Sequence, residues 1–156
     1  MTYADVQTQV RSLLANRLTR LEGYSEQNVT EGDYRIFTKG LTQGIVLRKG
    51  AANSQRLAIT AGDSYPTRNE YVVNIEVYVM YRTDVKTTRS NLNTEVEAVL
   101  AHLRQYPTLN LAGVKFSGPG DTSEPEEGNF PGSGWQFWRQ IITYPVTQLE
   151  SVAVAS

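Results

Sequence analysis

The residue types that usually carry out chemistry are sparse in this sequence. Its one histidine, His102, stands between Val99 and Leu103 in an apolar stretch, where a packing or surface role is favoured over that of a catalytic base or metal ligand. A Ser-His-acid triad would depend on His102, and no nucleophile elbow accompanies it. The glycines form neither a phosphate-binding loop nor a dinucleotide-binding pattern. We therefore expect no enzyme and no cofactor.

Carboxylates are the remaining candidates for chemistry, and they gather in residues 118–134. Such a group could bind a cation or act as an acid pair. Three prolines and five glycines in the same segment leave it without the rigid frame that a catalytic site needs. We expect a flexible, solvated acidic loop without a metal site, whose carboxylates are Asp121, Glu124, Glu126 and Glu127.

A mild excess of basic residues lies between Glu31 and Arg56 and could face phosphates or an acidic protein surface. Few aromatic residues are interleaved with them, which argues against dedicated nucleic-acid binding. Tyr and Trp on the long strands instead suggest that part of the sheet meets another subunit. Our candidate interface residues are Arg48, Lys49, Asp121, Glu124, Glu126, Glu127 and Trp138.

The size and composition of the chain predict one globular domain over residues 1–156. The chain is 40% hydrophobic, has a formal net charge of -1 and contains no cysteine, so disulfides and thiolate metal sites are excluded. The first residues lack the basic and apolar regions of a signal peptide, and no apolar run approaches the ~20 residues of a membrane span. We expect no membrane contact and synthesis and assembly in a cytoplasm.

The clearest element is a strand over Tyr71–Tyr81, where Val73, Ile75, Val77 and Val79 alternate with polar residues. Apolar residues at spacings of three and four predict helices over Val6–Leu21, capped by Thr2, and over Leu92–Leu103, which Pro107 stops. Further strands are expected at 33–39, 44–48, 57–60, 109–117 and 135–146, with loops at 24–32, 49–54 and 61–69.

These elements predict an α/β (α+β) fold, a single mostly antiparallel sheet with two main helices packed on one face. The strand at 135–146 is apolar on both faces, so it is either central in the sheet or partly covered by another chain. The tail at 149–156 is made of small residues, and we expect it to be mobile or to pair with the sheet edge of a neighbour.

The order of the elements resembles that of the tail-terminator proteins of long-tailed bacteriophages. The resemblance runs from about Tyr71 to Thr147, and the helix Val6–Leu21 fits the opening helix of that family. Its carriers are the strand Val72–Tyr81, the helix Leu92–Leu103 and the strand ends Val114–Ser117 and Phe137–Val146. The segment 118–134 departs from the shortest family members.

The resemblance implies a structural virion protein of the tail. Six copies would form a ring that caps the tail tube, ends its polymerisation and offers a surface to the neck or head-completion protein. DNA would cross the central hole only as passing cargo. The alternatives are a head-tail neck or connector protein and, from another class, a small-ligand-binding or metal-binding α/β domain that uses the acidic segment.

Overall fold

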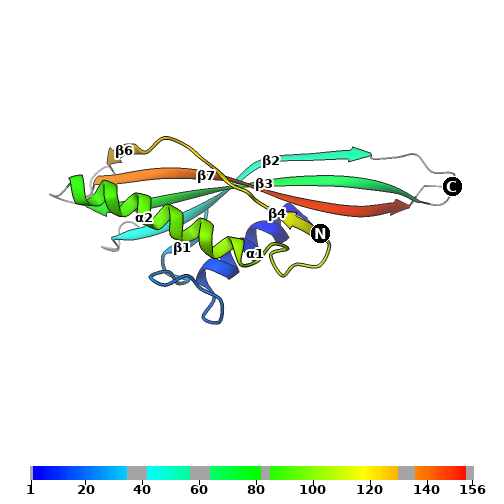
Figure 1. The fold of residues 1–156 in the computed structure, drawn as a ribbon, viewed down its shortest axis with the longest axis horizontal. Coiled ribbons are helices and arrows are strands. Elements are labelled where there is room, and N and C mark those ends of the chain that lie inside the picture. Colours follow the sequence, from blue (N-terminus) through cyan, green and yellow to red (C-terminus); the bar gives the residue numbers. More distant parts are fainter. Residues whose placement is uncertain (1, 35–41, 57–63, 82–84, 130–135, 154–156) are drawn as a thin grey trace.

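The structure is a computed structural model, and it describes residues 2–34, 42–56, 64–81, 85–129 and 136–153. These residues form a mixed α/β fold of two helices and a seven-stranded sheet. The strands are paired in the order β1-β2-β3-β7-β4, and β5 and β6 also pair with β7 (Figure 1). The predicted strands 33–39 and 57–60 lie largely outside the described residues.

The centre of the sheet is the antiparallel pair β3 (Ser64–Tyr81) and β7 (Gln136–Ala153). Their register is unbroken from Ser64 opposite Ala153 to Tyr81 opposite Gln136. The predicted strand 71–81 is therefore confirmed, but it begins seven residues earlier than expected. Pro66 lies in this added part of β3, opposite Ser151 of β7.

One edge of the sheet is built by β2 (Gln43–Arg56) and β1 (Val29–Glu31). β2 is antiparallel to β3, whereas β1 runs parallel to β2. The sheet is thus mixed, and the expectation of a mostly antiparallel sheet needs this correction. The loop expected at 49–54 is wrong, because β2 continues through a bulge between Lys49 and Ala52.

The other edge follows β7 in three short pieces, β4 (Val114–Ser117), β5 (Asp121–Thr122) and β6 (Glu126–Asn129). β5 and β6 overturn the expectation of a structureless loop over residues 118–129, because their backbones pair with β7. Residues 130–134 lie outside the described residues. The expected tail at 149–153 is likewise the end of β7, which pairs there with β3.

Helix α1 (Tyr3–Ala15) starts as predicted and ends early. Thr2 and Asp5 form a capping box at its start. At its end the side chain of Asn16 accepts a hydrogen bond from the backbone N–H of Leu18 at 3.0 Å, which competes with continuation of the helix. The prediction of a helix to Leu21 is therefore wrong, and Leu18 is 90% exposed.

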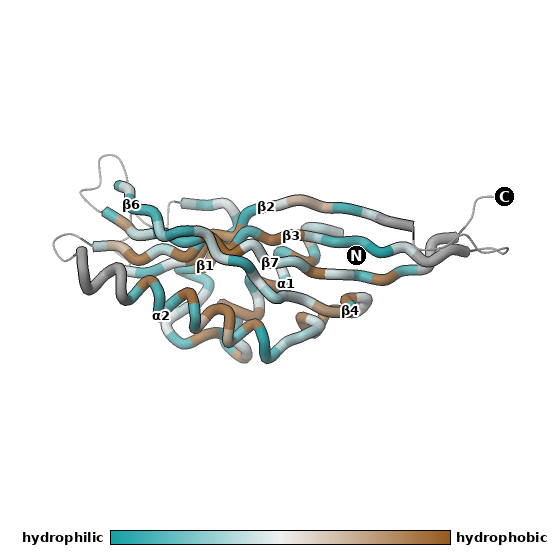
Figure 2. Tube along the Cα trace, turned by 45° about the horizontal axis from the view of Figure 1, so that its top comes forward, coloured by the Kyte–Doolittle hydropathy of each residue, from teal (hydrophilic) through white to brown (hydrophobic). Residues whose placement is uncertain are grey.

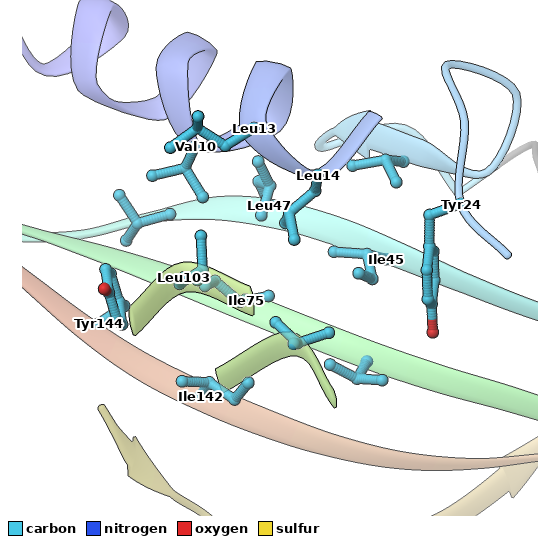
Figure 3. Packing of buried hydrophobic residues seen from close by; sticks show 14 of the residues in the cluster. Val10, Leu13, Leu14, Tyr24, Ile45, Leu47, Ile75, Leu103, Ile142 and Tyr144 are labelled. Atoms are coloured by element: carbon cyan, nitrogen blue, oxygen red, sulfur yellow. The ribbon is translucent and has the colours of Figure 1, made fainter. Parts of the chain in front are cut away.

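Helix α2 (Val85–Arg104) contains the predicted helix 92–103 and begins earlier. Both helices supply residues to a single hydrophobic cluster with the alternate side chains of β2, β3 and β7 (Figure 3). This is the apolar face that the period of two predicted for Val73–Val79. Neither helix in the described part of the chain is long and apolar enough to cross a membrane.

Beyond the helices, β2, β3 and β7 continue as a three-stranded extension, which we call the arm (residues 50–56, 64–72 and 146–153; Figure 1). β3 is hydrophobic beside the helices and becomes hydrophilic toward the end of the arm (Figure 2). Side-chain hydrogen bonds link the strands there: Asn69 donates to Gln148 at 3.1 Å and to Glu150 at 2.7 Å, and it accepts from Ser54 at 2.6 Å.

The arm leaves the core at the bulge in β2, where a tyrosine hydroxyl replaces backbone partners. The hydroxyl of Tyr3 accepts from the N–H of Gly50 at 2.9 Å and donates to the carbonyl of Val72 at 2.5 Å. A Cβ atom at position 50 would lie 2.7 Å from that carbonyl oxygen, so this approach requires glycine. The start of α1 is thereby fixed to the base of the arm.

Replacing Tyr3 with Phe should lower the free energy of unfolding by about 1–3 kcal/mol, because the N–H of Gly50 and the carbonyl of Val72 lose their shared partner. Urea denaturation measures this change. Tyr106→Phe is the matched control, since the structure gives the Tyr106 hydroxyl no hydrogen-bond partner among the described residues. Equal effects of the two substitutions would contradict the role assigned to Tyr3.

Candidate interaction surface

The predicted interface residues fall on opposite edges of the sheet. Arg48 and Lys49 lie in β2, at the edge that β1 continues, whereas the four acidic residues lie on or between β5 and β6, outside β7. The structure therefore does not bring the basic and acidic candidates together within one chain. It separates them by the width of the three long strands.

The register places members of the two groups on one level of the sheet. Arg48 is opposite Asn74, Asn74 is opposite Thr143, and Thr143 is opposite Asp121. A line across the strands at this level thus begins at a cation and ends at a carboxylate. A second copy placed edge to edge without a shift along the strands would bring its Arg48 to the Asp121 of the first.

Two of the four acidic candidates have partners within the chain, and two have none among the described residues. Glu126 forms an ion pair with Arg139, and Glu127 accepts a hydrogen bond from the hydroxyl of Tyr81. Asp121 and Glu124 are exposed, and their carboxylates have no partner among the described residues. These two carboxylates are therefore the ones available to a partner.

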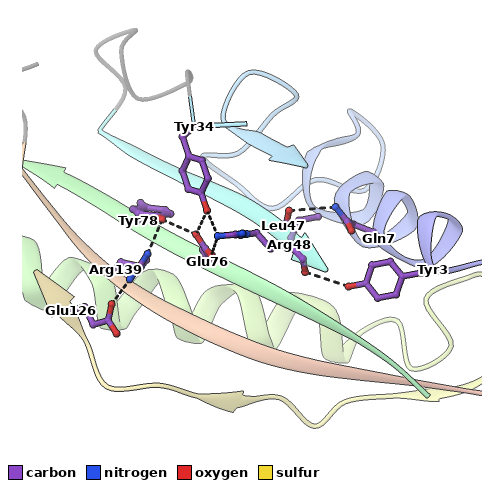
Figure 4. Close-up of polar contacts among 9 residues, drawn as sticks. All are labelled: Tyr3, Gln7, Tyr34, Leu47, Arg48, Glu76, Tyr78, Glu126 and Arg139. Atoms are coloured by element: carbon purple, nitrogen blue, oxygen red, sulfur yellow. Dashed lines mark hydrogen bonds and ion pairs between the residues drawn. The ribbon is translucent and has the colours of Figure 1, made fainter. Parts of the chain in front are cut away.

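The side chain of Arg48 in β2 extends to the carboxylate of Glu76 in the neighbouring strand β3. Glu76 is only 4% exposed, and its side chain lies 3.9 Å from the guanidinium of Arg48. The hydroxyls of Tyr34 and Tyr78 donate to Glu76 at 2.8 Å and 2.7 Å (Figure 4). Burial of this carboxylate is thus compensated by three polar partners.

The network continues from Glu76 to the acidic edge. Arg139 donates to the hydroxyl of Tyr78 at 3.4 Å and pairs with Glu126 (Figure 4). Alternating charges and hydroxyls therefore run from β2 through β3 and β7 to β6. The arrangement links the two edges of the sheet through polar side chains, and the exposed guanidinium of Arg48 stands at its outer end.

The remaining candidates are tied to the core. The Nζ atom of Lys49 lies 5.3 Å from the centre of the Tyr3 ring, which holds this cation beside the base of the arm. Trp138 is half-buried and packs against the main hydrophobic cluster. Its part in an interface stays a prediction.

His102 occupies a position that joins the two helices. It is 9% exposed, and its Nε2 atom lies 2.8 Å from the carbonyl oxygen of Leu13, to which it donates. Its ring also lies 5.6 Å from that of Tyr106. Among the described residues no group of three or more His, Asp or Glu side chains could hold a metal ion.

The exposure of Leu18 and the burial of Glu76 were not predicted from the sequence. The apolar spacing placed Leu18 on a helix stripe, although Asn16 is a residue that favours helix ends and could have signalled the stop. No local pattern distinguishes the buried Glu76 from a solvated one, because its partners come from distant positions in the chain.

Comparison with known proteins adds no assignment. No model of a known protein family matches the chain, and no curated protein matches it.

Glu76→Gln should lower the free energy of unfolding by about 2 kcal/mol, because two hydroxyls and a guanidinium lose a charged acceptor. Glu70→Gln is the control: Glu70 forms a partly exposed ion pair with Arg68 at 3.8 Å, and such pairs contribute little. Urea denaturation of both variants tests the difference. If Glu70→Gln lowered the free energy of unfolding as much as Glu76→Gln, the network would not stabilise the fold more than an exposed ion pair does.

Buried tyrosines predict a loss of stability at alkaline pH. Burial and the hydrogen bond to Glu127 raise the pKa of Tyr81 from 10.0 to about 12, and burial also raises the pKa values of Tyr24 and Tyr78. Above pH 10 the unfolded chain loses these protons while the folded chain keeps them, so stability is complete below pH 10 and falls as the pH rises toward 12.

Urea denaturation between pH 9 and 12 should show this fall, and it should be shallower in Tyr81→Phe. Absorbance of tyrosinate in the folded protein provides a second readout. An unchanged slope in Tyr81→Phe would contradict the raised pKa of that residue.

Proposed function

We propose that the chain is a structural protein that associates head to tail with its own copies into a closed ring. The observation that carries this proposal is the shared level of Arg48 and Asp121 on opposite edges of the sheet. Two different edges with opposite charge are complementary to each other, and a contact between unlike surfaces closes into a ring when its rotation divides the circle.

The likeness in element order to phage tail terminators makes the proposal specific. In that role a ring, with six copies as the expected number, caps the tail tube, stops its growth and receives the neck or head-completion protein. DNA passes through the opening without being held. We also propose that both helices cover the same sheet face, supported by the single cluster that they form with alternate residues of the strands.

Two features support this function. β2, β3 and β7 extend past the core as an arm, which gives each copy a long lateral boundary (Figure 1). Large apolar side chains remain exposed at Leu18 and Phe116. Exposed apolar groups and unpaired strand edges are features that association covers.

The mass of the purified protein in solution, with negative-stain images, tests the proposal. We expect a closed ring with a central opening that dissociates as the salt concentration rises, because charges at the edges are screened. A particle that stays monomeric at every concentration contradicts the proposal. A ring that binds a neck protein and not a tail tube would favour the connector alternative.

Asp121→Lys should weaken ring formation by up to about tenfold in dissociation constant, because reversing the charge turns an edge attraction into a repulsion. Glu70→Lys makes the same change of charge on the arm, away from the Arg48–Asp121 level, and should have little effect. Sedimentation velocity compares the two variants. Equal weakening would show that overall charge, and not the edge, controls association.

A further inference from the structure

The turn after α1 exposes an apolar side chain, that of Leu18, between the cationic side chains of Arg17 and Arg20. Leu18 is 90% exposed, and its neighbours Arg17 and Arg20 are exposed as well. The turn is well ordered by hydrogen bonds: Asn16 accepts from the N–H of Leu18 at 3.0 Å, and Thr19 donates to the carbonyl of Ser12 at 3.0 Å. The fold thus holds the side chain of Leu18 exposed to solvent, where it contributes no hydrophobic stabilisation to the isolated chain.

A groove of suitable chemistry lies on the other side of the molecule, between α2 and the edge strand β5. It has a volume of about 690 Å³, and one helical stripe of α2 forms its long wall. Apolar side chains of Val96, Leu100 and Ala101 line it together with Thr122 of β5 and Gln140 of β7.

The charges of the groove complement those of the turn. Glu97 lines the groove, is exposed and has no partner among the described residues. Arg104 lies at the far end of the groove. Arg17 and Arg20 beside the apolar side chain of Leu18 therefore match the Glu97 side of the groove.

The two features stand at opposite edges of the sheet. α1, which leads into the turn, contacts β1 and β2 as well as β3 and α2, whereas α2 contacts β3 and β7, and β5 lies outside β7. Two unlike surfaces on opposite edges suit a head-to-tail contact between copies.

We propose that Leu18, flanked by Arg17 and Arg20, docks into the α2–β5 groove of a second copy of this chain. The inference rests on the proposed head-to-tail association and names its central contact. The side chain of Leu18 covers the apolar side chains of Val96, Leu100 and Ala101, and the two guanidiniums approach Glu97. Each copy presents one turn and one groove, so every copy in a ring uses both.

Disulfide trapping tests the contact directly, because the natural chain contains no cysteine. Leu18→Cys and Ala101→Cys are made as separate proteins, mixed and oxidised mildly. We expect disulfide-linked heterodimers in the mixture and no linked homodimers in either protein alone. Gln105→Cys, directly after the end of α2 and outside the groove lining, replaces Ala101→Cys as the control and should give no product with Leu18→Cys.

Leu18→Ser supplies an equilibrium measurement. We expect it to raise the dissociation constant of self-association at least tenfold, as the loss of one buried leucine implies, while the melting temperature at low protein concentration stays unchanged because the side chain is exposed. Leu149→Ser, which alters another exposed leucine at 44% exposure, should change the constant less than twofold.

The outcomes separate this inference from the function on which it rests. If the natural protein forms rings but Leu18→Ser assembles equally well and no heterodimer is trapped, the docking is overturned and the ring stands. Homodimers of Leu18→Cys alone would also overturn it, because they place like turns together. If the natural protein never associates, the proposed function itself fails.

Discussion

The antiparallel pairing of β3 with β7 is the constraint on which the rest of the structure depends. Each strand is 18 residues long, and their register has no break. β2 is added to the free side of β3, and β4, β5 and β6 are added to the free side of β7. A slip of one residue would exchange the two faces of a strand and move the apolar set at Val73–Val79 away from the helices. Both edges therefore inherit their relative level from this one pair.

That shared level links the fold to the proposed assembly. Arg48 and Asp121 lie at the two ends of one line across the strands, and the network through Glu76, Tyr78 and Arg139 joins β2, β3 and β7. A ring requires each copy to repeat the same geometry, because small errors accumulate around the circle. The hydrogen-bonded network of Glu76, Tyr78 and Arg139, on the sheet face opposite the main cluster, links neighbouring strands and so helps each copy to keep the same geometry.

The sequence predicted elements whose signals are local. The alternation at 71–81 and the capping box of Thr2 and Asp5 follow from nearest neighbours along the chain, and both are present. The strand character of 149–153 and of β5 and β6 depends on pairing with distant segments, so composition there suggested a tail and a loop. Candidate charges could be named from the sequence, but their placement on opposite edges could not, because it follows from strand order. The exposed Leu18 escaped notice since its spacing imitates a helix stripe that ends at Ala15.

The long β3–β7 pair also has a mechanical consequence. A force applied along the strands loads many of its backbone hydrogen bonds in shear at once, so they must break together. The strands β4, β5 and β6 are only two to four residues long, so each is held to β7 by few backbone hydrogen bonds. They would detach from β7 one after another. Under tension β4, β5 and β6 would therefore separate from β7 first, while β3 and β7 stay paired. The backbone edge of β7 would then become accessible while the chain still bears load.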